Sequence, residues 1–257
     1  MARRGGAYTS DLSVDEALLL EELGVEPLEF VMGSSYFHVG YQLAGWSKNQ
    51  EMDRLTQSMA LARASAMHKL LAQVNAVDAD GVVGVRVQVE HRAHHAEFIA
   101  MGTAVSVRSN RAAWRAFGRP FTSDLSGQDF WSLVRGGYRP RAMVMGCCVY
   151  HVAHQSLGPW LKRVGNNCEM PNFTQALYDA RELAMARMQA EARAAGATGV
   201  VGMRVTESSH GWHPHVIEFL AVGTAVAPSG EAPQHEPIAA ILDGAARPVR
   251  GGAPSRG

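Results

Sequence analysis

The chain of 257 residues is poor in lysine and carries no net charge. Its only lysines are Lys48, Lys69 and Lys162, and its other basic residues are scattered arginines. With 24 basic and 24 acidic residues, the chain has no overall field that would attract nucleic acid or an anionic membrane surface. We therefore expect neither a nucleic-acid partner nor a membrane partner.

Cysteine and long apolar runs are also scarce. The cysteines Cys147, Cys148 and Cys168 are too few, and odd in number, for a disulfide framework. No apolar run approaches the length of a membrane-spanning helix, and polar residues follow the basic start at residues 1–4, where a signal peptide would have its apolar core. These absences predict a protein of the reducing cytoplasm.

What the chain does contain is one domain twice. Thr9–Ser13 recurs 113 residues later, Gly81–Val87 recurs 118 residues later, and Phe98–Val105 recurs 121 residues later. The offset grows only twice, so the copies differ by two short insertions. We assign residues 9–108 to repeat 1, 109–121 to a joining segment, 122–228 to repeat 2 and 229–257 to a tail whose Pro, Gly, Ala and Arg content is typical of disorder.

Each repeat begins with a short helix followed by an extended segment. Ser13 and Glu16 form a capping-box pattern in repeat 1, and Ser126 and Asp129 stand at the matching places in repeat 2. Residues 28–42, matched by 141–155, are rich in Val, Phe and Tyr, as β-strands are.

A long helix and two strands complete the unit. Apolar residues recur on one helix face at spacings of three and four: Leu55, Met59, Ala62, Ala66, Leu70 and Val74, then Phe173, Leu177, Ala180, Ala184 and Met188. Val83, Val85, Val87 and Val89 then alternate with small or polar residues, which predicts a strand with one apolar face. The fold class is therefore α+β, with a strand, a helix and a two-strand hairpin per repeat. A three-stranded sheet with an uncovered face is a poor end state, so we expect other copies to complete it.

These segments resemble the YbjQ-like family, whose members are labelled heavy-metal-binding domains. The resemblance is carried by the Gly81–Arg86 strand, the Ala- and Arg-rich helix before it and the closing Gly102–Val105, with residues 199–202 and 223–226 carrying it in repeat 2. It covers nearly all of both repeats but not the joining segment or the tail. It implies a dodecin-like α+β unit that assembles into rings, typically pentamers. The tandem duplication departs from the family's single-domain pattern.

Six of the 11 histidines lie in the two predicted hairpins: His91, His94 and His95, and His210, His213 and His215. Imidazole is the commonest ligand for zinc, copper and nickel, and short spacings at a turn can bring several onto one ion. We therefore predict a divalent transition-metal ion as a candidate cofactor, with an exposed histidine-rich hairpin as the alternative. The cysteines fit a thiolate site less well, because the adjacent Cys147 and Cys148 point to opposite faces of a strand.

A second set of polar residues is shared by both repeats: His38 and His151, Arg63 and Arg181, Arg86 and Arg204, and Glu97 and Glu218. We expect the glutamates to pair with these arginines and the histidines to lie in the core or at an interface. A histidine with a carboxylate could instead serve acid–base catalysis. No nucleophile, base and orienting group recur together, so we predict no enzyme.

The sequence thus predicts a non-enzymatic, ring-forming homo-oligomer that binds a heavy-metal ion, as the resemblance implies. One alternative is a scaffold that recruits a protein partner through residues 237–242 of its tail, and the other is a small hydrolase or lyase using the shared His and Glu. Both repeats can share one ring, which then has an even number of repeats, or each can form its own, so that five chains make two stacked five-unit rings. We predict the stacked pentamer, because it keeps the family's ring.

Overall fold

The computed structural model describes residues 9–38, 48–92, 95–115, 117–153, 171–209 and 215–230. None of the helices in these residues is both long enough and apolar enough to cross a membrane. The elements, in chain order, are α1 (Val14–Glu22), β1 (Val25–His38), β2 (Gln50–Glu51), α2 (Asp53–Ala76), β3 (Gly81–Arg92), β4 (His95–Val107), α3 (Arg111–Trp114), β5 (Phe121–Thr122), α4 (Gly127–Arg135), β6 (Tyr138–His151), α6 (Pro171–Ala194), β7 (Gly199–Ser209) and β8 (Val216–Pro228).

Each repeat forms an antiparallel sheet of three long strands, as predicted, but each sheet also gains a short fourth strand. The strand orders are β1-β4-β3-β5 and β2-β6-β8-β7. β5, which opens repeat 2, pairs in parallel with β3 of repeat 1, and β2, which precedes the long helix of repeat 1, pairs with β6 of repeat 2. The prediction of a three-stranded sheet is corrected in this respect: the repeats exchange short strands, and each exchange covers part of a sheet edge.

The long helices α2 and α6 pack on their own sheets through the predicted apolar stripes. The closest approach is made where the facing strand has a glycine. A Cβ atom at Gly33 would lie 2.1 Å from the carbonyl oxygen of Ala66, and one at Gly146 would lie 1.9 Å from that of Ala184. The stripe residues that are buried against their own sheets are Ala62, Ala66, Leu70, Val74, Ala180, Ala184 and Met188.

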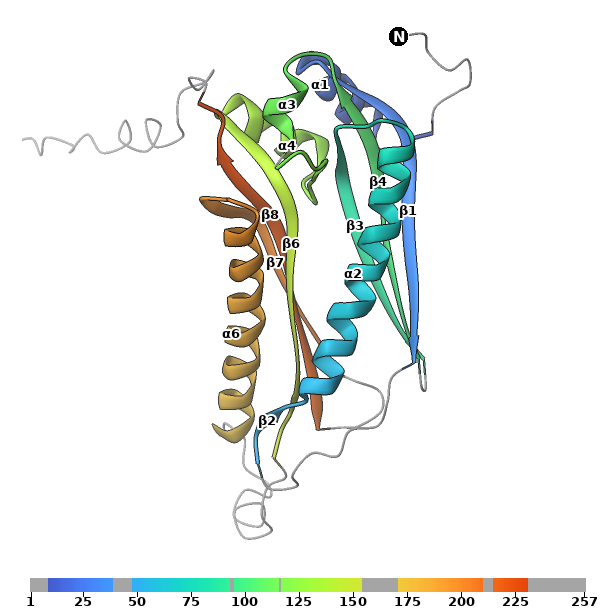
Figure 1. Ribbon diagram of the computed structural model, residues 1–257. Coiled ribbons are helices and arrows are strands. Elements are labelled where there is room, and N and C mark those ends of the chain that lie inside the picture. The colour runs from blue at the N-terminus through green and yellow to red at the C-terminus, as the bar shows by residue number, and fades with distance from the viewer. Residues whose placement is uncertain are drawn as a thin grey trace, which may run out of the picture.

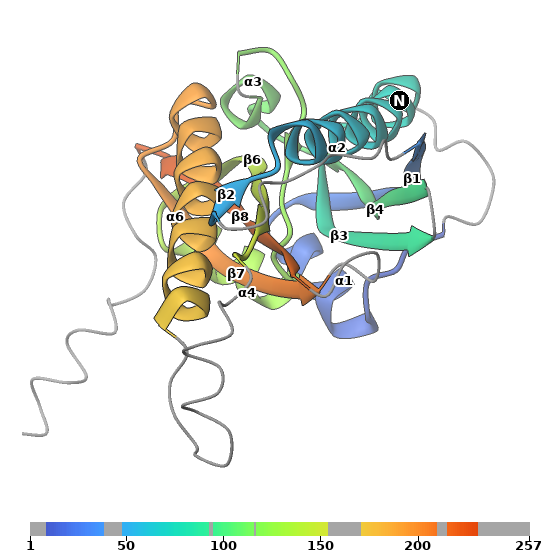
Figure 2. The ribbon, with the colours of Figure 1, turned by 90° about the horizontal axis from the view of Figure 1, so that it is seen from below.

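In Figure 1, α6 lies on one side of the second sheet, and α2 with the first sheet lies on the other. α2 contacts β1 and β4 of its own repeat and β6 of the other. Seen along the strands, β2 lies beside β6, next to the start of α2 (Figure 2). Within the described chain, no long helix therefore covers the face of the first sheet that points away from α2.

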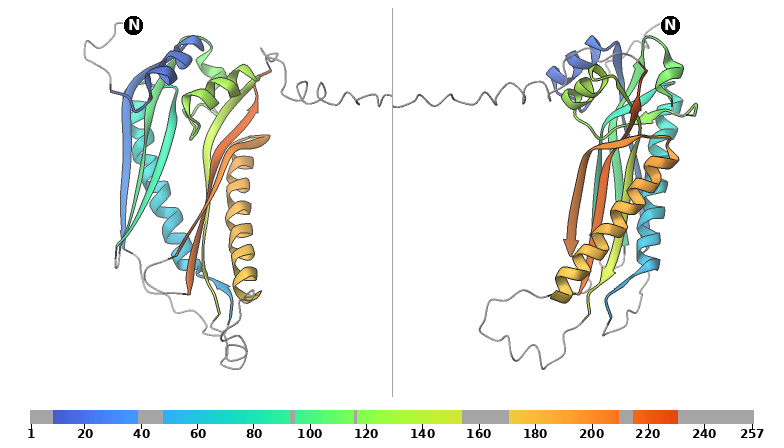
Figure 3. Two further views of the ribbon diagram at one scale, coloured as in Figure 1. Left: turned by 180° about the vertical axis from the view of Figure 1, so that it is seen from behind. Right: turned by 90° about the vertical axis from the view of Figure 1, so that its left-hand side faces the viewer.

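The short helices α1 and α4 pack together at one end of the molecule (Figure 3). Both have the predicted caps, with Ser13 accepting from the amide of Glu16 and Ser126 accepting from the amide of Asp129. Beside them, Trp114 of the joining segment packs in a buried cluster with Phe121 and Phe130, together with residues of β3 and β4. The sheet face that the sequence left uncovered is therefore covered at this end.

The alternation predicted along the hairpin breaks at one glycine in each repeat. Gly84 and Gly202 have φ angles of 68° and 63°, which favour glycine, and the register of β3 on β4 shifts between Val83 and Arg86. Val85 therefore packs in the α2 cluster, whereas Val83 packs with the short helices on the opposite face. The prediction that both valines share one apolar face is wrong, because the bulge adds a residue that reverses the alternation.

Candidate functional site

The joint between the repeats buries the face of β6 that points away from α6. Met143 and Met145 belong to one buried cluster with Val85 of β3 and the core of α2. Nearer the start of α2, Val149 packs against Met59 in a second cluster. The second sheet is thus covered on one face by its own helix and on the other by repeat 1.

Repeat 1 also completes the hydrogen bonding of β6 along its outer edge. The amide of Val149 donates to Thr56 Oγ1 at 2.9 Å, and its carbonyl accepts from the amide of Met52 at 2.8 Å. The carbonyl of Met145 accepts from Arg63 at 2.7 Å, and the same guanidinium pairs with Glu191 of α6. Buried backbone groups without partners are costly, so these bonds fix α2 on the strand edge.

The shared arginines Arg86 and Arg204 pair with aspartates and not with the predicted Glu97 and Glu218. Arg86 binds Asp11 at 2.5 Å, and Arg204 binds Asp124 at 2.9 Å. The reason is position along the strand, because Arg86 is opposite Met101, whereas Glu97 is opposite Glu90, nearer the hairpin tip. Of the other shared arginines, Arg63 binds Glu191 as described, and Arg181 lies over the ring of Tyr178, 5.0 Å from its centroid.

Asp124 is the centre of a buried polar cluster that the sequence analysis missed. Thr224 Oγ1 donates to the Asp124 carboxylate at 2.5 Å and accepts from the Asp124 amide at 3.0 Å, while Ser123 Oγ lies 3.2 Å from Thr224 Oγ1. Burial raises the pKa of Asp124, although the hydrogen bond from Thr224 and the charge of Arg204 act in the opposite direction.

Repeat 1 has the same cluster, built from Ser10, Asp11 and Thr103. The repeated Thr-Ser-Asp-Leu-Ser sequence, which aligns the two repeats, is the signal that could have found both clusters. The cluster fastens the segment that carries β5. In that segment, the backbone amide of Ser123 donates to the Val82 carbonyl at 2.9 Å, and the Ser123 carbonyl accepts from the Val85 amide at 2.8 Å. The cluster therefore positions a segment that covers the edge of the other repeat's sheet.

Cys147 and Cys148 point to opposite faces of β6, as predicted. Cys147 packs in the cluster with α2, and Cys148 packs in the cluster with α6. Burial raises the pKa of Cys147 to about 11 and that of Cys148 to about 12. Because a metal binds the thiolate, burial that raises the thiol pKa works against metal binding at both cysteines. Cys168 lies outside the described residues.

Only part of the predicted histidine site can be placed. The His91 side chain, His94, His210 and His213 lie outside the described residues. His95 lies beside His38, with ring centroids 5.4 Å apart, and Tyr36 stacks on His95 at 5.1 Å. Among the described side chains, no group of three or more His, Cys, Asp or Glu is placed to hold a metal ion. Two imidazoles are fewer than the three or four protein ligands of a typical zinc site, so the described residues do not complete one.

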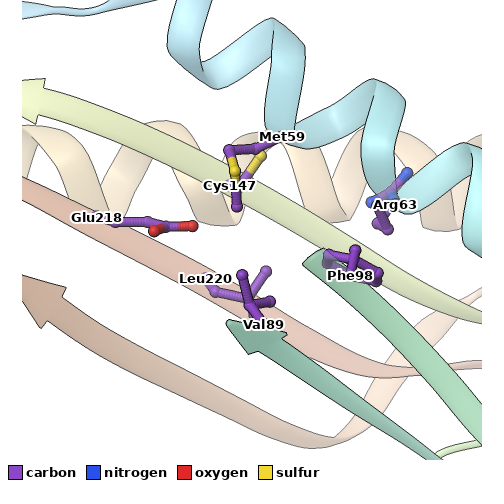
Figure 4. Close-up of a pocket in the computed structure, with 7 residues that line it drawn as sticks. All are labelled: Met59, Arg63, Val89, Phe98, Cys147, Glu218 and Leu220. Atoms are coloured by element: carbon purple, nitrogen blue, oxygen red, sulfur yellow. The ribbon is translucent and has the colours of Figure 1, made fainter. Parts of the chain in front are cut away.

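In repeat 2, His151 is buried in the joint, whereas His215 is only partly buried and lies near α6. His151 Nδ1 lies 3.2 Å from the carbonyl oxygen of Lys48, and the ring of His215 lies 6.3 Å from that of Phe173. Glu218 lines a cavity of about 10 Å³ together with Cys147 and five other residues (Figure 4). This is room for about one water molecule and not for a substrate.

A larger cleft of about 500 Å³ opens beside the joint. Arg63, Arg119 and Arg141 line it together with apolar residues that include Met67 and Met143. Both repeats contribute to its walls, so the cleft exists because the repeats are joined.

The fold and the joint define a tandem of two α+β units in which the helix of one unit covers the sheet of the other. The sequence model of the YbjQ family, described as "Putative heavy-metal-binding", matches residues 45–108 and 144–229. The chain belongs to this family, which confirms the resemblance.

Relatives support the same assignment. The chain is 47% identical over 228 residues to the "Encapsulin nanocompartment protein Rv1762c" of Mycobacterium tuberculosis, covering 87% of each chain. It is 41% identical over 58 residues to a UPF0145 protein of Clostridium perfringens and 45% identical over 58 residues to one of Thermus thermophilus. These two matches cover 23% of this chain and about half of each relative, at 53% and 49%.

Proposed function

We propose that this chain is a non-enzymatic, self-assembling structural protein of the YbjQ family. The observation that carries the proposal is the joint between the repeats. The outer face of the second sheet is covered by the helix of another unit and not by its own, which is how units of an oligomer contact each other. The name of the Mycobacterium tuberculosis relative, a nanocompartment protein, supports a role in a multi-subunit assembly.

Native mass spectrometry and size-exclusion chromatography with light scattering test this proposal. We expect the full chain at micromolar concentration to be a discrete oligomer. A chain that stays monomeric at that concentration would contradict the proposal.

The second candidate function is binding of a divalent transition-metal ion, as the family description suggests. The pair His38 and His95 at the tip of the first sheet supports it, because two imidazoles are already close together. We expect nickel or zinc binding with micromolar affinity, measured by calorimetry, and its loss in the variant His38→Ala/His95→Ala. His68→Ala, which removes an exposed histidine of α2, is the matched control. Binding in the millimolar range, or an equal loss of affinity in the control, would show that the hairpin is a histidine-rich surface without a specific metal site.

The other two alternatives have less support. The apolar tail residues 237–242 lie outside the described chain, so partner recruitment through them stays a prediction. The shared His151 and Glu218 are both buried, and the cavity that Glu218 lines has room for about one water, which does not favour a hydrolase or lyase.

A further inference from the structure

One strand face is covered in repeat 2 and open in repeat 1. Met145 and Val149 of β6 are 2% and 0% exposed, because α2 and the first sheet cover them. Their counterparts 113 residues earlier are Met32 and Tyr36 of β1, which are 46% and 58% exposed. An apolar patch that is exposed in one copy and buried in the other marks a surface that is suited to a partner.

The edge of β1 is open at Tyr36, whereas at Met32 the amide donates to Gln73 Oε1 at 3.1 Å and the carbonyl accepts from Gln73 Nε2 at 2.6 Å. In repeat 2, the amide and carbonyl of Val149 bond to Thr56 and Met52 of repeat 1. Tyr36 holds this position in repeat 1, and among the described residues its backbone has no matching partners outside the sheet. Open strand edges readily accept a further chain.

Repeat 2 carries the complementary open surface on α6. Leu55 and Met59 of α2 are buried against the second sheet. Their counterparts 118 residues later, Phe173 and Leu177 of α6, are only half-buried, and the neighbouring Tyr178 is exposed. The helix face that repeat 1 uses to cover a sheet is thus present in repeat 2 without a sheet to cover.

The strand β7 shows the same difference. Val85 of β3 is fully buried and packs in one cluster with Met143 and Met145 of the other repeat. Its counterpart Met203, on β7, is 46% exposed, and Val205 on the same strand is exposed as well. Within the described chain, Met203 has no residues to pack against in the way that Val85 packs against Met143 and Met145. The residues that could fill this place in a second copy are the counterparts of Met143 and Met145, which lie on the open face of β1.

The edge of β3 is covered by Phe121, whereas the matching place on β7 is open among the described residues. A Cβ atom at Gly81 would lie 2.4 Å from the ring of Phe121, whereas at Gly199 the nearest atom is 3.9 Å away, on Val226. Gly199 therefore keeps an open space where Gly81 receives an aromatic ring. The sequence has Tyr8 113 residues before Phe121, next to the segment that the Ser10 cluster fastens.

We propose that repeat 2 of one chain packs on repeat 1 of a second copy through the same contact that joins the two repeats within a chain. This proposal rests on the proposed self-assembly and names its surfaces. α6 covers the face of β1 that carries Met32 and Tyr36, and Thr174 takes the part of Thr56. Arg181 takes the part of Arg63 on the Met32 carbonyl, whose second lone pair remains beside the bond from Gln73. Each chain then offers the open face of β1 to one neighbour and the open face of α6 to another.

A head-to-tail contact of this kind closes into a ring with an even number of repeats or grows into a filament. It excludes the stacked pentamer predicted from the sequence. In that arrangement α2 would cover β1 of another chain's repeat 1, but this face of α2 already covers β6.

The contact between the short helices has to differ between chains. A Cβ atom at Gly127 of α4 would lie 2.5 Å from Cβ of Glu16 in α1, and the counterpart of Gly127 in repeat 1 is Val14. α4 of one chain therefore cannot approach α1 of the next as closely, so the sheet faces and long helices carry the contact between chains.

Disulfide cross-linking of the full chain tests the proposal. In a chain with Cys168→Ser, the pair Tyr36→Cys and Thr174→Cys matches the contact between Val149 and Thr56. We expect oxidation to give a ladder of covalent oligomers on a denaturing, non-reducing gel. Each single variant should give no ladder, and an equimolar mixture of the two should give only a covalent dimer. If Tyr36→Cys dissolves the oligomer, Met32→Cys with Arg181→Cys applies the same test to the neighbouring contact.

The matched control is Tyr36→Cys with Thr56→Cys, which a stacked ring would bring together between chains. An oligomer that cross-links through this pair, or through neither head-to-tail pair, would overturn the head-to-tail contact and leave self-assembly intact. A monomeric chain would instead overturn the proposed function itself.

Discussion

The two repeats have the same fold but leave opposite parts of it exposed. Repeat 1 has a buried long helix and an open sheet face, whereas repeat 2 has a buried sheet face and an open long helix. The same residue type shows the difference, since Met32 is exposed and Met145 is buried at matching positions. Exposure at these positions is therefore set by which neighbour the chain supplies and not by the pattern within the repeat.

Such paired positions make each repeat a control for the other. Residues that serve the unit itself should have equal effects in both copies. Residues that serve the contact between units should affect folding in one copy and assembly in the other.

The largest effect is expected from a charge on the strand face. Met145→Asp puts an unpaired carboxylate into the buried joint and should destabilise the chain by roughly 4 kcal/mol or more. Met32→Asp places the same charge on the open face, so we expect a folded chain that no longer assembles. Circular dichroism during urea unfolding measures the first effect, and size-exclusion chromatography measures the second. Equal loss of folding in both variants would contradict the comparison.

The difference between the repeats should vanish for the stripe that faces each repeat's own sheet. Leu70 and Met188 occupy matching positions and are both fully buried. Replacing either by Ala should lower the free energy of unfolding by about 2–5 kcal/mol. Urea titration checks this, and a variant without loss would show that its helix does not pack on the sheet as described.

The buried thiols of β6 sharpen the comparison through pH, because Ser34 replaces Cys147 in repeat 1. Burial raises the pKa of Cys147 to about 11, while an unfolded thiol ionises near pH 8.5. The unfolded chain therefore loses its proton first, and the free energy of unfolding should fall by about 3 kcal/mol between pH 8.5 and 11. Cys147→Ser should flatten this part of the profile. Tyr150, whose pKa burial also raises, contributes equally in both chains. An unchanged profile would argue against burial of the thiol.

The sequence predicted the parts of the fold that have a local signal. Helical periodicity located α2 and α6, and the capping patterns located α1 and α4. The two-residue strands β2 and β5 could not be predicted, because two residues show no periodicity and their pairing is decided by the other repeat. The partners of Arg63 and Arg86 were missed for a similar reason, since Glu191 and Asp11 are distant in the sequence. The pair His38 and His95 depends on strand register, which the sequence did not fix.

The smallest expected effect is a difference in stability loss between substitutions at the two matching helix caps. Glu16 accepts hydrogen bonds from the amides of Ser13 and Gly127, both at 2.8 Å, and so links α1 to the start of α4. Its counterpart Asp129 accepts from the Ser126 hydroxyl of its own helix. Glu16→Ala should therefore cost about 1 kcal/mol, and Asp129→Ala a few tenths less.

Acid pH should erase this difference between the caps. Burial alone would raise the pKa of Glu16, but the amide hydrogen bonds outweigh it and hold the pKa below 4.5. A lowered pKa means that the carboxylate stabilises the fold above pH 4.5, and that this contribution is lost as the pH falls through the folded-state pKa. Urea titrations at pH 7 and near pH 3 should show the Glu16→Ala effect shrinking relative to wild type. An effect of constant size would show that helix propensity, and not the two hydrogen bonds, accounts for the loss.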